Sequence, residues 1–268
     1  MLVDIIIGLG LSLIIAFLAY KKKSLDLSGF LGAILFGTLI YIFGSYVVWS
    51  ILISFFISSS LLTKLHEKKD QERSEGRNIV QVISNAMIAT VFSILYYVTK
   101  ESFFMLAAVV SIAASNADTW ASEIGILSKG KTYYITNFKV APKGASGAIT
   151  VLGTLASFIG ALFIAIIFVT LYGLVTPLTP IEIVSYGFIV TISGFLGCQI
   201  DSLLGALLQA KYKGVNSGVI TEKKWLPNEK VILASGIAFI TNDMVNLISS
   251  FGAALISILM VIGGIHAS

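Results

Sequence analysis

The sequence predicts an all-α fold: a polytopic helical membrane protein of about eight transmembrane helices that form a single transmembrane domain over residues 1–268. The mean hydropathy is +0.93, and 56% of residues are hydrophobic whereas only 12% are charged. So little polar surface does not cover a water-soluble globule. Apolar stretches of about 20 residues also recur along the chain, and basic residues gather in alternate connecting segments.

The predicted spans follow one another with short connections. The first carries "MLVDIIIGLGLSLIIAFLAYKKK", which has neither a basic start nor a small-residue cleavage site, so we expect a retained helix and not a signal peptide. A short turn at Gly44 separates the second span from the third. The last span is long enough to break into two pieces. In order, the spans are residues 1–20, 29–43, 46–63, 79–98, 102–127, 147–171, 183–209 and 230–263.

The basic residues indicate how these spans are oriented. Seventeen of the 18 lysines and arginines fall in four connecting segments on one side of the predicted membrane, and Lys100 alone falls on the other. By the positive-inside rule the four segments are cytoplasmic and the amino terminus lies outside. We expect an integral protein of a prokaryotic cytoplasmic membrane, in contact with membrane lipids and with no nucleic-acid partner. The oligomeric state stays open.

Apart from Asp4 near the start of the chain, four acidic residues lie inside the predicted spans. Asp118 and Glu123 belong to "SNADTWASEIG" in the fifth span, Asp201 lies in the seventh, and Asp243 lies in the eighth. An ionised, unpaired carboxylate at membrane depth costs several kcal/mol, so such residues predict a functional site that faces the bundle interior. The lysines and arginines lie almost entirely outside the spans. A bound divalent cation such as Mg²⁺ is therefore the simplest compensating charge.

Helical geometry separates some polar groups and aligns others. At about 100° per residue, Asp118 and Glu123 diverge by about 140°, so one metal ion binds both only if the helix unwinds locally. The seventh span carries small residues beside its acid, which allow a neighbouring backbone to come close. The fourth and eighth spans carry polar side chains at helical spacing. These sets are Gly194, Gly197, Asp201 and Gly205; Arg77, Gln81 and Asn85; and Asn242, Asn246 and Ser249 beside Asp243.

A second candidate site is the segment "FKVAPKGASGAIT", residues 138–150. Glycines let backbone N–H groups approach an anion, a helix N-terminus adds positive potential, and lysine supplies a point charge, so the segment suits a phosphate group. A plain basic turn before a helix is the alternative interpretation. Ser146 is a candidate N-cap for the sixth span. The residues concerned are Lys139, Pro142, Lys143, Gly144, Ser146 and Gly147.

Five motifs occur in the order "RNIVQVISNA", "SNADTWASEIG", "VAPKGASGAITVLGTLAS", "IDSLLGALLQ" and "TNDMVN". They closely resemble an integral-membrane family, long catalogued as a domain of unknown function, that includes transmembrane protein 19 and the plant phytyl-phosphate kinase of tocopherol synthesis. The resemblance covers nearly the whole chain. It implies a Mg²⁺-dependent kinase that prefers CTP and converts an isoprenyl or polyprenyl monophosphate, an isoprenoid lipid phosphate, into the diphosphate.

The resemblance also implies roles for particular residues. The metal ion and the phosphates would be held by Asn116, Asp118, Glu123, Asp201, Asn242 and Asp243, of which Asp118, Glu123 and Asp201 are the predicted catalytic residues. The nucleotide triphosphate or the acceptor phosphate would be bound by Lys143, Gly144 and Gly147. The chemistry of their own side chains adds Arg77, Asn85, Lys139 and Ser146 to this phosphate-binding set.

Two other functions use the same acids. A cation- or proton-coupled transporter would use them as a relay, and helices broken by Gly or Pro in matching halves are its typical pattern. The four prolines, at positions 142, 177, 180 and 227, all fall in predicted loops, which disfavours the transporter. A lipid-binding scaffold without chemistry would not need four acids at membrane depth. The kinase is therefore the leading hypothesis.

Overall fold

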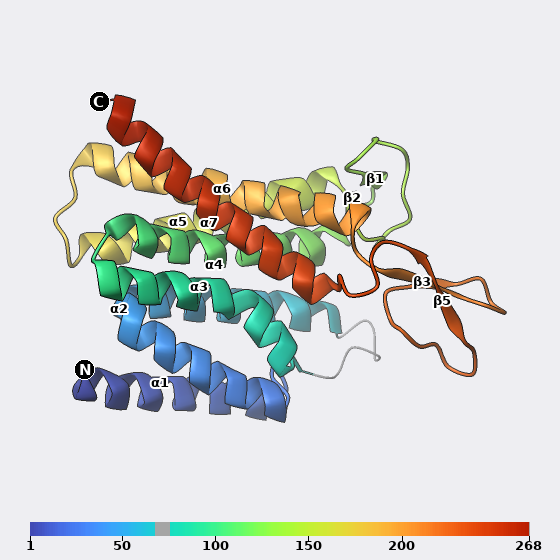
Figure 1. The fold of residues 1–268 in the computed structure, drawn as a ribbon, viewed down its shortest axis with the longest axis horizontal. Coiled ribbons are helices and arrows are strands. Elements are labelled where there is room, and N and C mark those ends of the chain that lie inside the picture. Colours follow the sequence, from blue (N-terminus) through green and yellow to red (C-terminus); the bar gives the residue numbers. More distant parts are fainter. Residues whose placement is uncertain (68–75, 268) are drawn as a thin grey trace.

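The computed structural model describes residues 1–67 and 76–267, which form seven long helices with two small sheets at one end (Figure 1). All seven helices are long and apolar enough to cross a membrane. The predicted class, a helical membrane protein, is therefore confirmed. The helices are α1 (Leu2–Lys21), α2 (Leu27–Glu67), α3 (Ile79–Thr99), α4 (Ser102–Gly125), α5 (Val151–Gly173), α6 (Pro180–Leu207) and α7 (Asn242–Ala267).

Helix α2 contains two membrane crossings. A straight helix of its 41 residues would be about 60 Å long, twice the thickness of the hydrocarbon core. At Ser45 the backbone leaves helical geometry, with φ 70° and ψ 172°, and the chain turns back (Figure 1). Gly37 and Trp49 consequently both lie against Ser12 of α1, whose hydroxyl accepts a hydrogen bond from Trp49 Nε1 at 3.1 Å. The turn predicted at Gly44 is correct to within one residue.

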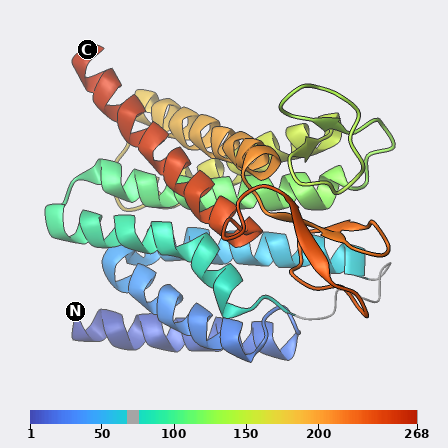
Figure 2. The ribbon, with the colours of Figure 1, turned by 45° about the vertical axis from the view of Figure 1, so that its right-hand side comes forward.

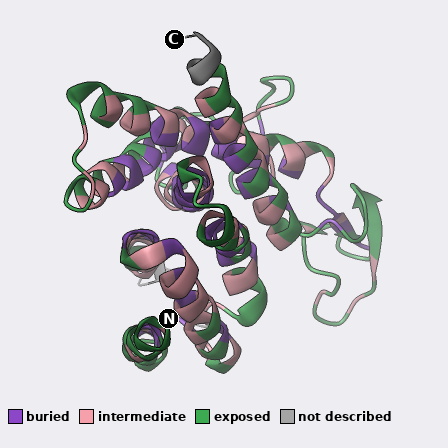
Figure 3. Cartoon of the chain, turned by 60° about the vertical axis from the view of Figure 1, so that its left-hand side comes forward, coloured by how far each residue is buried: buried purple, intermediate pink, exposed green. Residues whose placement is uncertain are grey.

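Helix α4 is the centre of the bundle. It packs against α2, α3, α5, α6 and α7, and residues 105–117 are all buried, in keeping with the buried interior of the bundle in Figure 3. Small side chains let neighbouring helices approach closely where lipid removes the hydrophobic driving force. A Cβ atom added at Gly194 of α6 would lie 2.8 Å from Ala113 Cβ of α4. The predicted stripe of small residues on α6 is thus confirmed as a close helix contact.

The segments that connect the helices carry strands that the sequence did not predict. Two antiparallel sheets lie at the end of the bundle that comes forward in Figure 2. The first pairs β1 (Tyr133–Tyr134) with β2 (Ala148–Ile149). The second has the order β4-β3-β5, with β3 (Lys211–Gly214), β4 (Ile220–Thr221) and β5 (Val231–Ser235). Strands this short are invisible to hydropathy windows of about 20 residues.

The last predicted span, residues 230–263, begins too early. Its first residues form β5, which pairs with β3, and Gly236 has a φ of 78°, a left-handed conformation that suits glycine. A side chain at Gly236 would collide with the carbonyl group of Gln209. The helix itself starts at Asn242. Asn242 and Asp243 therefore lie in the first turn of α7, at the end of the bundle that carries the sheets.

The described residues of the basic segments lie at this same end, and Met1, Lys100 and the carboxyl-terminal end of α7 lie at the other (Figure 1). This agrees with the alternation of basic and non-basic connections along the sequence. The polypeptide is thus an integral membrane protein whose basic loops and sheets gather on one side. That this side is cytoplasmic stays a prediction from the positive-inside rule.

Candidate active site

A cavity of about 820 Å³ lies at the end of the bundle that carries the sheets. Pockets for small ligands and cofactors usually have a volume of about 300–1,000 Å³, so this one is large enough for a nucleotide. Residues from α2 to α7 and from the segment before α5 line it. The sequence-predicted residues among them are Arg77, Asn85, Asp118, Glu123, Lys143, Gly144, Ser146, Gly147, Asp201, Asn242 and Asp243.

Two carboxyl groups form the deepest charged part of the cavity. Asp118 extends from α4 and Asp201, only 8% exposed, extends from α6. The two carboxylates interact electrostatically with each other, and each has a neutral hydrogen-bond donor. Cys198 Sγ lies 3.9 Å from Asp118 Oδ1, and Ser249 Oγ of α7 donates to Asp201 Oδ2 at 2.8 Å. Two neighbouring negative charges in one cavity, that of Asp201 on a buried residue and that of Asp118 on a half-buried one, favour a bound cation.

Glu123 lies on another wall of the same cavity. Its Oε1 accepts a hydrogen bond from Thr63 Oγ1 of α2 at 2.7 Å, and its carboxylate interacts electrostatically with Arg77. Helix α4 is continuous from Ser102 to Gly125, so the local unwinding that would bring Asp118 and Glu123 to one metal ion does not occur. The two carboxylates therefore face different parts of the cavity.

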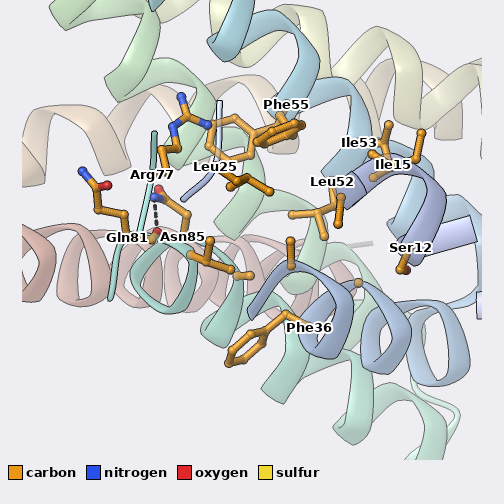
Figure 4. Close-up of a pocket in the computed structure, with 16 residues that line it drawn as sticks. Ser12, Ile15, Leu25, Phe36, Leu52, Ile53, Phe55, Arg77, Gln81 and Asn85 are labelled. Carbon is orange, nitrogen blue, oxygen red and sulfur yellow. Dashed lines mark hydrogen bonds between the residues drawn. The ribbon is translucent and has the colours of Figure 1, made fainter. Parts of the chain in front are cut away.

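The predicted polar ladder also reaches the cavity, although only Gln81 and Asn85 lie on α3, because Arg77 precedes the N-cap of that helix. Arg77 is fixed by its backbone, whose N–H donates to Ser24 O at 3.0 Å and whose carbonyl accepts from Asp26 N at 3.1 Å. Asn85 Nδ2 donates to Gln81 O at 2.7 Å, the dashed line in Figure 4. Arginine, glutamine and asparagine present hydrogen-bond donors along one wall, which suits phosphate oxygens.

The segment before α5 closes the cavity from the side of the sheets. Gly144 and Gly147 have φ angles of 76° and 77°, so each adopts the left-handed conformation. Lys143 Nζ donates to the carbonyl of Ser128, which ties the two ends of the β1–β2 segment together. The Ser146 hydroxyl contacts Gly205 O and Gln209 Oε1, each at 2.8 Å. Backbone and lysine nitrogens thus border the cavity where phosphates would enter.

Ser146 is not the N-cap that the sequence predicted. The α5 helix begins at Val151, and Thr150 is its N-cap, because Thr150 Oγ1 accepts a hydrogen bond from Gly153 N at 2.9 Å. Ser146 instead holds the loop against α6. The predicted span starting at residue 147 was therefore four residues too early.

Two predicted site residues lie away from the cavity. Asn116 is fully buried, and both ends of its amide group are used. Its Nδ2 donates to Gly160 O of α5 at 2.7 Å, and its Oδ1 accepts from Ser58 Oγ of α2 at 2.9 Å. Asn116 thus joins three helices and does not line the cavity. Lys139 is exposed on the loop and does not line the cavity either.

Other residues line the cavity without having been predicted. Thr63 and Gln209 lie near helix ends. Polar residues are common at such positions, so their presence there does not indicate a functional site. Glu222 follows β4 in a segment without periodicity, and only the tertiary fold brings it to the cavity. Burial raises the pKa of the Glu222 carboxyl, while the neighbouring Gln209 amide and the positive charge of Lys211 partly offset this rise.

The residues present fit a divalent cation. Among the described residues that line the cavity, five carry carboxyl groups and two carry fixed positive charges: Asp118, Glu123, Asp201, Glu222 and Asp243 against Arg77 and Lys143. Asn246 Oδ1 is buried and has no hydrogen-bond partner in the described structure, as expected of an oxygen ligand. No three His, Cys, Asp or Glu side chains in the described chain converge on one point. Mg²⁺ commonly uses only one or two carboxylates, together with waters and substrate phosphates.

Replacing Ser249 with alanine should lower the activity of this site by about 10- to 100-fold, because a hydrogen bond to a charged group contributes about 1.5–3 kcal/mol. The substitution removes the hydroxyl that orients Asp201. Ser250 is a matched control: it is equally buried, but its hydroxyl donates to Leu247 O within α7. The steady-state rate of turnover at this site, measured for Ser249→Ala and Ser250→Ala at equal folded fractions, tests this prediction. Equal rates for the two variants would remove Ser249 from the site.

Comparisons with known proteins agree with the membrane fold. The family model described as integral membrane protein DUF92 matches residues 10–254. Protein PGR of Arabidopsis thaliana is 33% identical over 264 residues, which cover 89% of this chain and 90% of that protein. An uncharacterized membrane protein of Methanocaldococcus jannaschii is 34% identical over 213 residues, covering 78% and 85%. Protein VTE6, chloroplastic, of Arabidopsis thaliana is 27% identical over 247 residues, covering 88% and 65%. No solved structure matches the chain.

Proposed function

Since the chain belongs to the DUF92 family of integral membrane proteins, we propose that it is a Mg²⁺-dependent kinase of isoprenyl or polyprenyl monophosphates. It uses CTP or another nucleoside triphosphate and acts at the cytoplasmic side of the membrane. One observation carries this proposal: a single cavity at the end of a membrane bundle gathers five carboxyl groups, an arginine, a lysine and left-handed glycines. Transfer of a phosphoryl group to a lipid phosphate requires groups that position the phosphates and neutralise their charge.

In this proposal, residues in different parts of the cavity bind the metal ion, the nucleotide phosphates and the acceptor phosphate. Asp118 and Asp201, with Asp243, Asn242 and Asn246 of α7 nearby, would hold Mg²⁺, which supplies positive charge that neutralises the phosphates during transfer. The loop that contains Lys143 and the two glycines, Gly144 and Gly147, would bind the nucleotide phosphates through its backbone N–H groups and its ammonium group. Arg77 and Asn85 on the α3 wall would bind the acceptor phosphate.

The reaction requires positioning more than it requires a base. An oxygen of the acceptor monophosphate, already anionic at neutral pH, attacks the γ-phosphorus of the nucleotide. The bond between the γ-phosphorus and the β–γ bridging oxygen breaks, and the products are the lipid diphosphate and a nucleoside diphosphate. No histidine or other general base is needed to remove a proton. Glu123, paired with Thr63, would keep Arg77 in place beside the acceptor.

The helices that line the cavity disfavour the transporter alternative. Transporters usually bind their substrates where helices are interrupted. In the described chain α3 to α7 are continuous, and the one non-helical residue inside an assigned helix, Ser45, lies at the opposite end of the bundle from the cavity. Continuous helices that hold fixed carboxylates suit a preorganised site for chemistry better than a site that opens alternately to both sides.

The decisive experiment uses purified full-length protein in nanodiscs. The protein is incubated with Mg²⁺, with CTP, ATP, GTP or UTP, and with geranyl, farnesyl, geranylgeranyl or phytyl monophosphate, and products are identified by mass spectrometry. We expect the lipid diphosphate and a nucleoside diphosphate in equal amounts, with CTP as the best donor, and no product when EDTA removes the metal.

A parallel measurement separates the kinase from a transporter. The same protein in liposomes is tested for proton or cation flux without nucleotide. Flux in the absence of nucleotide, together with no diphosphate from any lipid and nucleotide pair, would contradict the proposed function. Diphosphate formation without flux supports it.

A further inference from the structure

A second, apolar pocket lies between α1, the two arms of α2, and the start of α3 (Figure 4). Leucine, isoleucine, phenylalanine and alanine side chains make up most of its wall, with Ser12 at its far end. Its volume is about 70 Å³. A site for one water-sized group needs about 10–15 Å³, so the pocket holds roughly five to seven carbon-sized groups. That is one isoprene unit, and not a whole prenyl tail.

The apolar pocket and the large polar cavity share three residues. Arg77, Gln81 and Asn85 line both, and Figure 4 shows them together at one end of the apolar pocket. The Arg77 guanidinium also lies over the rings of Phe55 and Phe56, 5.9 Å and 5.7 Å from their centroids, and both rings line the apolar pocket. A polar wall with a positive charge thus stands where the apolar pocket meets the acidic cavity.

This junction matches a molecule with a negatively charged head and a hydrocarbon beginning directly behind it. We propose that the apolar pocket binds the isoprene unit next to the phosphate of the acceptor lipid, while Arg77 and Asn85 hold that phosphate at the junction. The inference rests on the proposed function, because it concerns the acceptor of that reaction. The remainder of the tail leaves the pocket and stays among the bilayer lipids.

The pocket acts on orientation more than on affinity. Lipid chains are as apolar as the pocket wall, so moving one isoprene unit from the bilayer into the pocket gains little hydrophobic free energy. Filling a shaped pocket does, however, fix the direction in which the head group points. The acceptor oxygen is then held towards the nucleotide phosphates, and such positioning accounts for a large part of catalysis in bimolecular reactions.

Photolabelling tests the assignment directly. The probe is geranylgeranyl monophosphate that carries a diazirine on the isoprene unit next to the phosphate, used with the full-length protein in nanodiscs and without nucleotide. Irradiation followed by peptide mass spectrometry should place the label on α1, α2 and α3 at pocket residues such as Ile15, Leu52 and Val82. An excess of unlabelled geranylgeranyl monophosphate should remove that labelling.

Two substitutions on one arm of α2 provide matched variants. Ala33→Phe fills the pocket, whereas Leu31→Phe changes a residue that is 58% exposed and faces away from it. Labelling at the pocket should fall at least about tenfold in Ala33→Phe, because the added ring occupies the volume of the isoprene unit; this corresponds to about 1.4 kcal/mol in occupancy of the pocket. Labelling should stay unchanged in Leu31→Phe. If Ala33→Phe does not fold, the label map of the unaltered protein decides alone.

The outcome is independent of turnover, because labelling requires binding and not phosphate transfer. Label on α5, α6 or α7, label that excess monophosphate does not displace, or full labelling of a folded Ala33→Phe variant would each overturn the tail assignment, even if the protein makes diphosphate. Label in the pocket without any diphosphate would support the tail assignment and refute the kinase.

Discussion

Replacing Asp118 with asparagine is expected to lower the rate of diphosphate formation by about 100- to 1,000-fold, the range seen when one preorganised electrostatic group is removed from a site. Asparagine has the same shape as aspartate, so packing against Cys198 of α6 is retained. The negative charge that would hold the metal beside Asp201 is lost. The loss should appear in kcat at saturating CTP, while the thermal unfolding temperature in detergent stays close to that of the unaltered protein.

Glu101→Gln is the matched control for this prediction. Glu101 is a carboxylate at the other end of the same helix, exposed, and without a capping hydrogen bond from its side chain. Its substitution removes one negative charge from α4 but leaves the cavity unchanged, so the rate should stay within about twofold of the original, as for most surface changes. Normal turnover by a folded Asp118→Asn variant would show that the buried carboxylates are not the catalytic centre.

Substituting alanine for Gly147 should both destabilise the protein and inactivate it. The residue has a φ of 77°, and an added Cβ would lie 2.6 Å from Ala206 Cα and 2.7 Å from Ala206 N, atoms of the α6 backbone. A left-handed conformation costs a non-glycine residue about 1–2 kcal/mol, and overpacking adds about 1–3 kcal/mol. The loop must therefore move away from α6. The nitrogen atoms of the loop that border the cavity then move with it.

Gly144 allows these two costs to be separated. Its φ is 76°, nearly the same as that of Gly147, but an added Cβ would meet nothing within 4 Å. Gly144→Ala should thus lose only the conformational term, about 1–2 kcal/mol. Unfolding of both variants, followed by temperature in one detergent, tests the difference. Equal losses would mean that the contact between Gly147 and α6 does not restrict the loop.

The convergence of the acidic residues on one cavity was predictable, because a carboxylate is tolerated at few positions in a membrane-spanning helix. A carboxylate in a spanning helix must face the interior or a polar cavity, and Asp118, Asp201 and Asp243 do line one cavity. Hydropathy also located the spans, since lipid-facing helices need long apolar stretches. The doubled helix α2 could be recognised for the same reason, because Gly44 interrupts an apolar stretch too long for one crossing.

Other features depend on tertiary contacts and strand pairing, which hydropathy and residue spacing do not reveal. Residues 231–235 are as apolar as a membrane helix, yet they pair with β3, and the helix starts later as a result. Asn116 and Asp118 belong to one motif, but two residues along a helix turn by about 200°. They therefore face opposite neighbours, and only one reaches the cavity. The position of Glu222 likewise depends on the pairing of β4 with β3, which leaves no periodic pattern.

The three residues shared by the apolar pocket and the polar cavity, Arg77, Gln81 and Asn85, set how a lipid would reach this protein. A lipid whose charged head group and hydrocarbon chain both bind there need not be extracted from its membrane leaflet. Such a lipid arrives and departs by lateral diffusion. The encounter then takes place in two dimensions. Its frequency follows the mole fraction of acceptor in the membrane, and diluting the acceptor with inert phospholipid would slow the proposed reaction even at constant bulk concentration.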